Sequence, residues 1–379
     1  MRRMRLGIVG IVLLVGTACG TPAGDDGTLL MVKRAHDLVA VDVPGGGVRF
    51  KAPLGLVAPD GSRIVAAKHQ GSETILRELD PAVGSERWRV HLPGRLMPRV
   101  VSRSGLVALT RVGRPGVVVV AGRGGELRRV ELERPAEPEA FTSDEETLVI
   151  VGYLPERGPD RYRLLEFDLS SGDVAPLGAR VKRLAPDEMQ GSGRTAVWAP
   201  DASSLYTLFT LQPSGGHGSG VSDAAAFVHV LDLDGWAHCV DLPEGFGAGG
   251  RVALAIGPDG TALYAIDAAA SRVAVVDTGA LRVSRIVPIE SFPDGQVVAA
   301  ASAVTLAVGG GTALRLLDVH SLAERARLDL PDQPTGLSAV PGGFYALTAE
   351  RIVAVNEHDS SLRPLDAILG ATSIALVTP

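Results

Sequence analysis

The chain has 379 residues, a formal net charge of −6 at pH 7 and 46% hydrophobic residues. Acidic residues outnumber basic ones, which argues against a nucleic-acid-binding protein, because such a protein carries a basic footprint. There are only two cysteines, so the fold cannot depend on a framework of disulfides.

The first 18 residues have the composition of a signal peptide. Arg2, Arg3 and Arg5 form a basic head, residues 6–15 form an apolar run, and small residues fill positions 16–18. The apolar run is shorter than the roughly 20 residues that a membrane-spanning helix needs. We therefore expect residues 1–18 to direct export and then to be removed.

Cys19 directly follows the small residues, and the stretch from Gly16 to Cys19 resembles a bacterial lipobox. Gly16 departs from the Leu, Val or Ala usual at its position, so an ordinary secreted or membrane-retained signal stays open as the alternative. The resemblance implies a lipid-modified Cys19 that anchors the protein on the extracytoplasmic side of the cell membrane. Residues 19–27 then read as a flexible polar tether and residues 28–379 as a single domain.

A short apolar run that ends in an acid or an amide recurs along the chain. The residues that end it are Asp42, Asp80, Asp168, Asp232, Asp277, Asp318 and Asn356. Their spacing, with one copy lacking the acid, averages about 45 residues, the length of a four-stranded β-propeller blade. The recurring acid itself is expected to stabilise a turn.

A turn of the Pro-Asp-Gly type precedes most copies, as at 59–61 and 258–260, with Pro-Asp-Ala at 200–202. Proline fixes one dihedral, aspartate bonds back to the backbone and glycine accepts a positive φ. One complete unit is predicted to have strands at 253–256, 262–266, 272–277 and 284–288. We name these strands A to D.

The two ends of the domain lack complementary parts of one unit. Residues 29–34, 37–43 and 48–53 supply strands B, C and D, and residues 372–379 supply a strand A. We therefore predict an all-β fold, a β-propeller whose ring is closed by pairing of the N-terminal strands with the C-terminal strand. Eight blades are expected, with seven as the alternative.

Two motifs carry resemblances to known repeats. The stretch Pro258 to Thr278, PDG-x-x-LYAID followed by VAVVDT, resembles the YVTN repeats of bacterial propellers. Asp80-x-x-Val83-Gly84-x-x-x-Trp88 is similar to the tryptophan-docking repeat of quinoprotein-like propellers. The resemblance implies a propeller, and one lipid-anchored eight-bladed propeller of this type is a scaffold in outer-membrane protein assembly. It implies no functional residue for this chain.

No local pattern indicates a catalytic centre. The HExxH pattern of zinc proteases and the phosphate-binding loop are both absent from the sequence. We expect a protein-binding or scaffold module that needs no cofactor. The alternative is a propeller enzyme, lactonase-like or a quinone-dependent oxidoreductase, whose site is assembled in the central channel from distant blades.

His229 and His238 are weak candidates for a metal site. If Asp234 and Gly235 form a two-residue hairpin turn, His229 pairs with Val240, and both histidines share one face of the sheet. No third ligand is evident, so packing between blades is the preferred interpretation and no metal is expected.

Three long connections, at 152–161, 178–194 and 212–225, should emerge on one face from adjacent blades. Long loops on a rigid scaffold commonly carry function, so this face is the predicted binding face, although tolerated insertions would look the same. The expected partner is a membrane or envelope protein. The candidate residues are Tyr153, Glu156, Arg157, Asp160, Arg161, Asp187, Glu188, Met189, His217 and Asp223.

Overall fold

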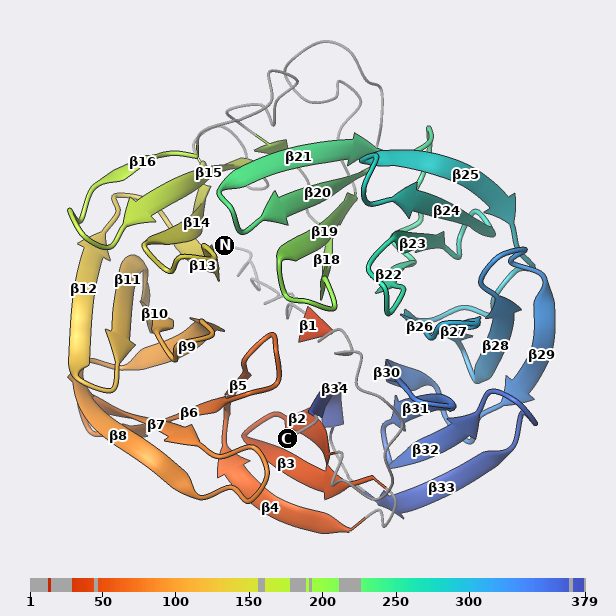
Figure 1. The fold of residues 1–379 in the computed structure, drawn as a ribbon, viewed down its shortest axis with the longest axis horizontal. Helices are drawn as coiled ribbons and strands as arrows, with labels where there is room; N and C mark the ends of the chain where they lie inside the picture. The colour runs from red at the N-terminus through yellow and green to blue at the C-terminus, as the bar shows by residue number, and fades with distance from the viewer. Residues whose placement is uncertain are drawn as a thin grey trace, which may run out of the picture.

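The computed structural model describes residues 13–14, 29–43, 47–155, 161–177, 189–190, 193–210, 226–367 and 371–377. All regular elements in these ranges are β-strands, and they form eight antiparallel blades around a ring (Figure 1). The prediction of eight blades is therefore confirmed. No helix in these ranges is long and apolar enough to cross a membrane.

Each blade has four main strands, which we name A to D from the centre of the ring outward. Blade 1 contains β34 (Ala371–Val377), β2 (Leu29–Arg34), β3 (Asp37–Asp42) and β4 (Val48–Pro53). Blade 2 contains β5 (Gly55–Val57), β6 (Ile64–Gln70), β7 (Glu73–Leu79) and β8 (Glu86–Pro93). Blade 3 contains β9 (Leu96–Val101), β10 (Val107–Arg111), β11 (Arg114–Gly122) and β12 (Gly125–Glu131). Blade 4 contains β13 (Ala136–Phe141), β14 (Thr147–Tyr153), β15 (Arg161–Asp168) and β16 (Val174–Pro176), with β17 (Met189–Gln190) paired to β15.

The second half of the ring repeats this plan. Blade 5 contains β18 (Gly193–Trp198), β19 (Ser204–Thr210), β20 (Phe227–Asp232) and β21 (Trp236–Asp241), and β1 (Leu13–Leu14) pairs in parallel with β18. Blade 6 contains β22 (Val252–Ile256), β23 (Ala262–Asp267), β24 (Arg272–Asp277) and β25 (Arg282–Pro288). Blade 7 contains β26 (Val297–Ala301), β27 (Thr305–Gly310), β28 (Ala313–Asp318) and β29 (Glu324–Asp329). Blade 8 contains β30 (Pro334–Val340), β31 (Gly343–Thr348), β32 (Arg351–Asn356) and β33 (Leu362–Ala367).

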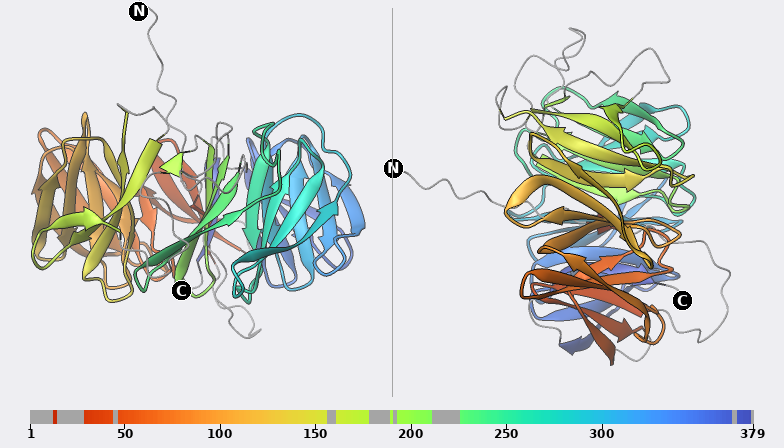
Figure 2. Two further views of the ribbon diagram at one scale, coloured as in Figure 1. Left: turned by 90° about the horizontal axis from the view of Figure 1, so that it is seen from above. Right: turned by 90° about the vertical axis from the view of Figure 1, so that its left-hand side faces the viewer.

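Because the strands alternate in direction, the ring has two distinct faces (Figure 2). We call the face with the A–B and C–D turns, such as the turn at 58–63, the AB face. The face with the B–C turns and the D–A connections, such as the turn at 71–72, is the BC face. The assignment matters because segments far apart in sequence meet on the same face.

The ring closes as predicted, within blade 1. β34 pairs antiparallel with β2, and Leu29 lies opposite Val377. Since β34 is strand A and β2 is strand B of the same blade, both of these residues lie at the AB face. The closure leaves no sheet edge open between the first and last blades.

The core lies between the blades rather than in one place. Strands B and C are buried on both sides, as in β19 and β27, whereas the outermost strands β25 and β29 alternate between exposed and half-buried residues. Each of the eight seams between neighbouring blades has its own cluster of buried apolar side chains. This is why the strands are rich in Val, Leu and Ile without a polar alternation.

The repeated turns have the chemistry expected from the sequence. Gly61 and Gly260 take positive φ values of 74° and 73°, and the alanine in the third copy, Ala202, is held at 55°. The aspartate that ends strand C acts locally, since Asp318 Oδ1 accepts hydrogen bonds from the backbone N–H groups of His320 and Ser321 at 3.0 and 2.8 Å. These acids are therefore turn residues, as predicted.

Candidate functional site at the seam between blades 4 and 5

Three of the predicted binding-face residues lie in described strands, and they meet at one edge. Tyr153, at the end of β14, pairs with Tyr162 of β15, and Met189 of β17 pairs with Tyr162 from the other side. Arg161 precedes Tyr162 and pairs with Gln190. The other seven candidates lie outside the described residues: Glu156, Arg157, Asp160, Asp187, Glu188, His217 and Asp223.

Met189 does not suit its predicted role. Its side chain is only 2% exposed and belongs to the apolar cluster between blades 4 and 5. It packs under the surface instead of presenting a contact to a partner. The sequence could not distinguish the two roles, because a methionine after an acidic stretch looks the same in both cases.

The centre of the site is Arg194, on strand A of blade 5. Its Nη2 donates to both carboxylate oxygens of Glu139, on strand A of blade 4, at 2.8 and 2.7 Å. Its Nη1 lies 3.4 Å from the hydroxyl oxygen of Tyr153, which itself donates to Glu137 at 2.9 Å. These contacts join the two blades at the edge from which the long connections start.

The electrostatics of this site keep its arginine charged and its tyrosines neutral. Burial lowers the pKa of Arg194, but the charge and hydrogen bond of Glu139, together with the nearby Tyr153 and Tyr162, outweigh burial and raise the pKa above its usual value. Burial raises the pKa of Tyr153 and of Tyr162, so both phenols stay neutral at physiological pH. The described groups are thus suited to positioning and binding.

An aromatic stack lies against the guanidinium of Arg194. The rings of Tyr162, Phe209 and Phe227 stack in series with centroids 5.1 and 5.0 Å apart, and the Arg194 guanidinium lies 5.2 Å from the Phe209 centroid. Stacked rings and a cation over a ring face add stability beyond the area they bury. The stack adds apolar contact between blades 4 and 5 at this part of the seam.

Sequence reasoning missed Glu139 and Arg194, and a local signal existed for the first. Glu139 is the extra residue of a β-bulge in β13, directly after Pro138. Arg99 occupies the same place in β9, directly after Pro98. Bulges redirect side chains, and proline, which lacks an N–H, is tolerated in a sheet mainly at bulges and edges. A proline followed by a charged residue in a predicted strand A was the signal.

The expected pairing of the two histidines is wrong by one residue. His229 lies opposite Cys239, and His238 lies opposite Val230, so the two side chains point to opposite faces of the sheet. The turn has three residues, ending at Gly235 with a φ of 90°, instead of two. No group of three or more potential metal-binding side chains exists among the described residues.

Cys239 packs among the apolar side chains between blades 4 and 5. Burial raises the pKa of its thiol, with a smaller contribution from the charge of Asp241. A neutral thiol in an apolar setting is a poor nucleophile. Cys239 is therefore a small core residue of this seam.

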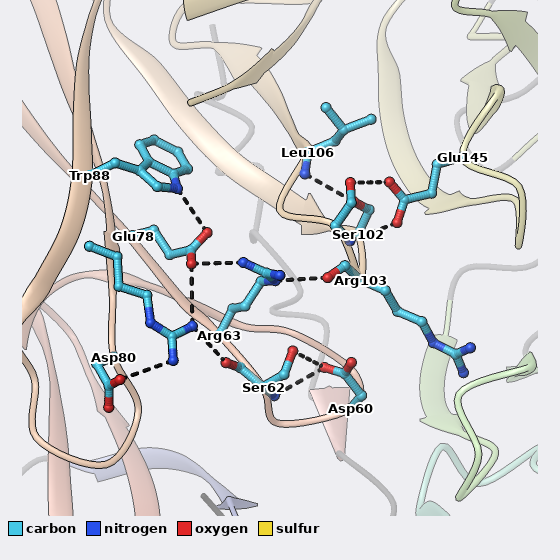
Figure 3. A network of polar contacts seen from close by, with 12 residues as sticks. Asp60, Ser62, Arg63, Glu78, Asp80, Trp88, Ser102, Arg103, Leu106 and Glu145 are labelled. Carbon is cyan, nitrogen blue, oxygen red and sulfur yellow. Dashed lines mark hydrogen bonds and ion pairs between the residues drawn. The ribbon is translucent and has the colours of Figure 1, made fainter. Parts of the chain in front are cut away.

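A second polar network lies on the AB face and joins blades 2 to 5 (Figure 3). Glu78, buried in strand C of blade 2, accepts hydrogen bonds from Arg63 at 2.8 Å and from the Trp88 indole N–H at 2.9 Å. Arg63 also donates to the Arg103 carbonyl of blade 3 at 2.7 Å, and Arg103 donates to the Asp201 carbonyl of blade 5. Trp88 is the residue of the docking-type motif, so the motif here helps to join neighbouring blades.

Comparisons with known proteins agree with the architecture. No protein-family profile matches the chain, and neither does any curated protein. Among solved structures, apo AztD from Citrobacter koseri is similar at 13% identity and a TM-score of 0.58, over 92% of this chain and 98% of that chain. The dihydro-heme d1 dehydrogenase NirN in complex with DHE is similar at 14% identity and a TM-score of 0.60, over 93% of this chain and 76% of that chain. Sqt1 from Saccharomyces cerevisiae is similar at 10% identity and a TM-score of 0.52, over 82% of this chain and 83% of that chain. At such identities the likeness shows the fold alone.

Proposed function

We propose that this chain is a binding module, anchored by a lipid on Cys19 to the extracytoplasmic side of a bacterial cell membrane, that holds a protein partner on its BC face. The basic head, apolar run and small residues before Cys19 support the anchoring. The propeller supports the binding role, because it is a rigid ring that presents many connections on two broad faces. The partner is an envelope protein.

The observation that carries this proposal is the separation of the tether from the binding face. The domain begins at Leu29, which lies at the AB face beside Val377. Three long connections instead join strand ends on the BC face, after Tyr153, before Gly193 and after Thr210. A tether that leaves from the AB face would turn that face toward the bilayer and leave the BC face open to a partner.

The length of the tether sets how far the ring can stand from the membrane. About ten residue steps separate Cys19 from Leu29, and at roughly 3.3–3.6 Å per step they reach at most about 35 Å. The BC face then lies farther from the membrane than the AB face, by the thickness of the ring. The part of the partner that docks should therefore project from the membrane.

The seam between blades 4 and 5 gives the BC face its rigid support. Arg194 of blade 5 binds Glu139 and Tyr153 of blade 4, and Arg161 begins the next strand of blade 4 at the same edge. An arginine and a tyrosine at a fixed edge are the residue types that most often dominate protein–protein interfaces. We expect Tyr153 and Arg161 to contact the partner.

The test separates anchoring from binding. For anchoring, bacteria are labelled with an alkyne fatty acid. The wild-type protein should be labelled and should fractionate with membranes, and Cys19→Ala should lose both the label and the membrane association.

For binding, chemical crosslinking on intact cells should capture a partner with wild type and with Arg282→Glu, an exposed control on the outer strand of blade 6. Arg161→Glu and deletion of residues 213–223 should each reduce the captured partner. Equal capture by all variants would contradict the BC face as the binding face.

A further inference from the structure

Blade 3 carries an excess of positive charge. Residues 94–135, its four strands with the adjoining connections, contain nine arginines and three glutamates, with no lysine or aspartate. The segment therefore has a net charge of +6 in a chain whose net charge is −6. A concentration of one sign on part of a protein surface attracts and orients partners of the opposite sign.

Three of these arginines lie together at the BC face. Arg111 ends β10 and Arg114 begins β11, and the two lie directly opposite each other across the B–C turn. Arg95 precedes β9, and its carbonyl accepts a hydrogen bond from the backbone N–H of Val112, in the same turn, at 2.8 Å. Arg95 and Arg114 are exposed, and Arg111 is half-buried. Three neighbouring strands thus bring three arginines to one edge of the blade.

These arginines have no anionic partner in the part of the chain that the structure describes. None of the three makes an ion pair or a side-chain hydrogen bond there. Of the nearby acids, Glu126 of the same blade and Glu73 of blade 2 have basic partners of their own, at 2.7 and 3.4 Å. Glu131 and Glu133 lie at the end of β12 and just after it, and neither pairs with the three arginines. The positive charge of this edge is therefore not neutralised locally.

The same turn in other blades shows what is missing here. In blade 1, Arg34 ends β2 and Asp37 begins β3, and Arg34 Nε donates to Asp37 Oδ1 at 2.6 Å. In blade 6, Asp267 lies opposite Arg272 and pairs with it at 3.5 Å. Like charges directly opposite each other in an antiparallel pair destabilise the sheet. Blade 3 has two cations where blades 1 and 6 have a cation and an acid, so the carboxylate must come from another molecule to relieve the repulsion.

The geometry of the turn suits carboxylates on neighbouring residues. Val112 and Gly113 form a two-residue turn, with Gly113 at a φ of 79°, so Arg111 and Arg114 are held close together. A guanidinium binds a carboxylate through two parallel hydrogen bonds, which makes two adjacent arginines a site for two adjacent acids. Val112, at the tip of the turn, is 45% exposed and offers an apolar contact beside them.

We propose that this edge of blade 3, made of Arg95, Arg111, Val112 and Arg114, binds an acidic segment of a protein partner, with neighbouring carboxylates on the arginines and an apolar residue against the valine. The inference rests on the proposed function for the BC face as the face that meets a protein. It adds the chemistry by which that protein is recognised. Blade 3 adjoins blade 4, so this edge lies on the same face as Tyr153.

Binding is tested on the purified full-length chain in a neutral detergent, by fluorescence anisotropy of a labelled peptide. The probe is a capped twelve-residue peptide with three Asp-Glu pairs and two valines in a Gly-Ser background, and the control peptide has Asn-Gln in place of each pair. The acidic peptide should bind with a Kd of about 100 μM or below, and the neutral peptide at least about tenfold more weakly. Added salt should weaken binding of the acidic peptide, because it screens exposed charges.

Variants then locate the site. Arg114→Asp rebuilds the arrangement of blade 1, because it places a carboxylate opposite Arg111. It should weaken binding by at least about tenfold and raise the midpoint of thermal unfolding by about 1–2 °C. A loss of binding caused by damage to the fold would instead come with a lower midpoint. Arg282→Asp, which changes an exposed arginine on the outer strand of blade 6, is the matched control and should bind as the wild type does.

The outcomes distinguish this inference from the function proposed above. Equal binding of the two peptides, unchanged binding by Arg114→Asp, or a lower midpoint in that variant would each overturn the inference, even if crosslinking on cells still captures a partner. Tighter binding of polyphosphate or of phosphatidylglycerol vesicles, lost in the same variant, would overturn the assignment to a protein segment. Selective binding of the acidic peptide that Arg114→Asp loses would support the inference, even if no partner is captured on cells.

Discussion

Arg194 holds both carboxylate oxygens of Glu139 across the seam between blades 4 and 5, at 2.8 and 2.7 Å. The side chains are 13% and 6% exposed, so the pair is largely removed from water. Glu139 reaches this position because a bulge interrupts the alternation of β13. The bulge in β13 therefore makes possible the ion pair that joins blades 4 and 5.

Arg194→Met should destabilise the fold by about 3 kcal/mol, because it leaves the buried Glu139 without its cation. The matched control is Arg89→Met, which breaks a more exposed pair with Glu86 whose side chains are 52% and 27% exposed. That control should lower the free energy of unfolding by less than about 1 kcal/mol. Urea unfolding measures both. Similar losses in the two variants would contradict a structural role for the seam pair.

The repeated turns allow a paired test of backbone strain. Ala202 is held at a φ of 55° where the equivalent Gly260 has 73°. Ala202→Gly should raise the free energy of unfolding by up to about 1 kcal/mol, and Gly260→Ala should lower it by about 1 kcal/mol, because a Cβ disfavours this conformation. Thermal and urea unfolding measure both. A loss of stability in Ala202→Gly would show that the alanine side chain contributes more than the strain costs.

The protein should lose stability when one hydrogen-bond donor is removed from the polar network on the AB face. Trp88→Phe removes the indole N–H that lies 2.9 Å from the buried Glu78 carboxylate. We expect a loss of about 1–2 kcal/mol, since the carboxylate keeps its arginine partners but loses one hydrogen bond. Trp236→Phe, at a half-buried tryptophan in β21, is the control and should cost less. Equal losses would mean that ring size alone determines the effect.

His238 should make stability depend on pH. Burial lowers the pKa of His238, and the charge of Asp241 opposes this only in part. The unfolded chain takes up a proton at the ordinary pKa of about 6.5 while the folded chain resists it, so His238 reduces stability as pH falls below about 6.5. Relative to wild type, His238→Gln should therefore become more stable as pH drops from 8 to 5. A difference between the two proteins that is constant with pH would contradict this.

The sequence predicted features that depend on neighbouring residues. The Asp of strand C binds backbone groups two or three positions away, so its repetition could be read directly, and the blade count followed from the spacing. The register of β20 and β21 was missed because a turn of two or three residues at Asp234 has almost the same composition, yet one residue reverses every side chain.

Contacts between blades were beyond the reach of the sequence. Glu139 and Arg194 are 55 positions apart, and Arg103 and Asp201 are 98 positions apart. Such pairs form only when the assembled ring brings together strands A or A–B turns of different blades. The charged residues at the two bulges could be noticed by their prolines, but their partners could not.

The closure of blade 1 by β34 has a consequence for biogenesis. Strand A of the first blade is also the last strand along the chain, so seven other blades are synthesised before the first one is complete. Until then β2 presents an open edge that can pair with other chains. Ring closure thus depends on full-length synthesis, because a chain that stops before residue 371 lacks β34 and keeps an exposed strand edge.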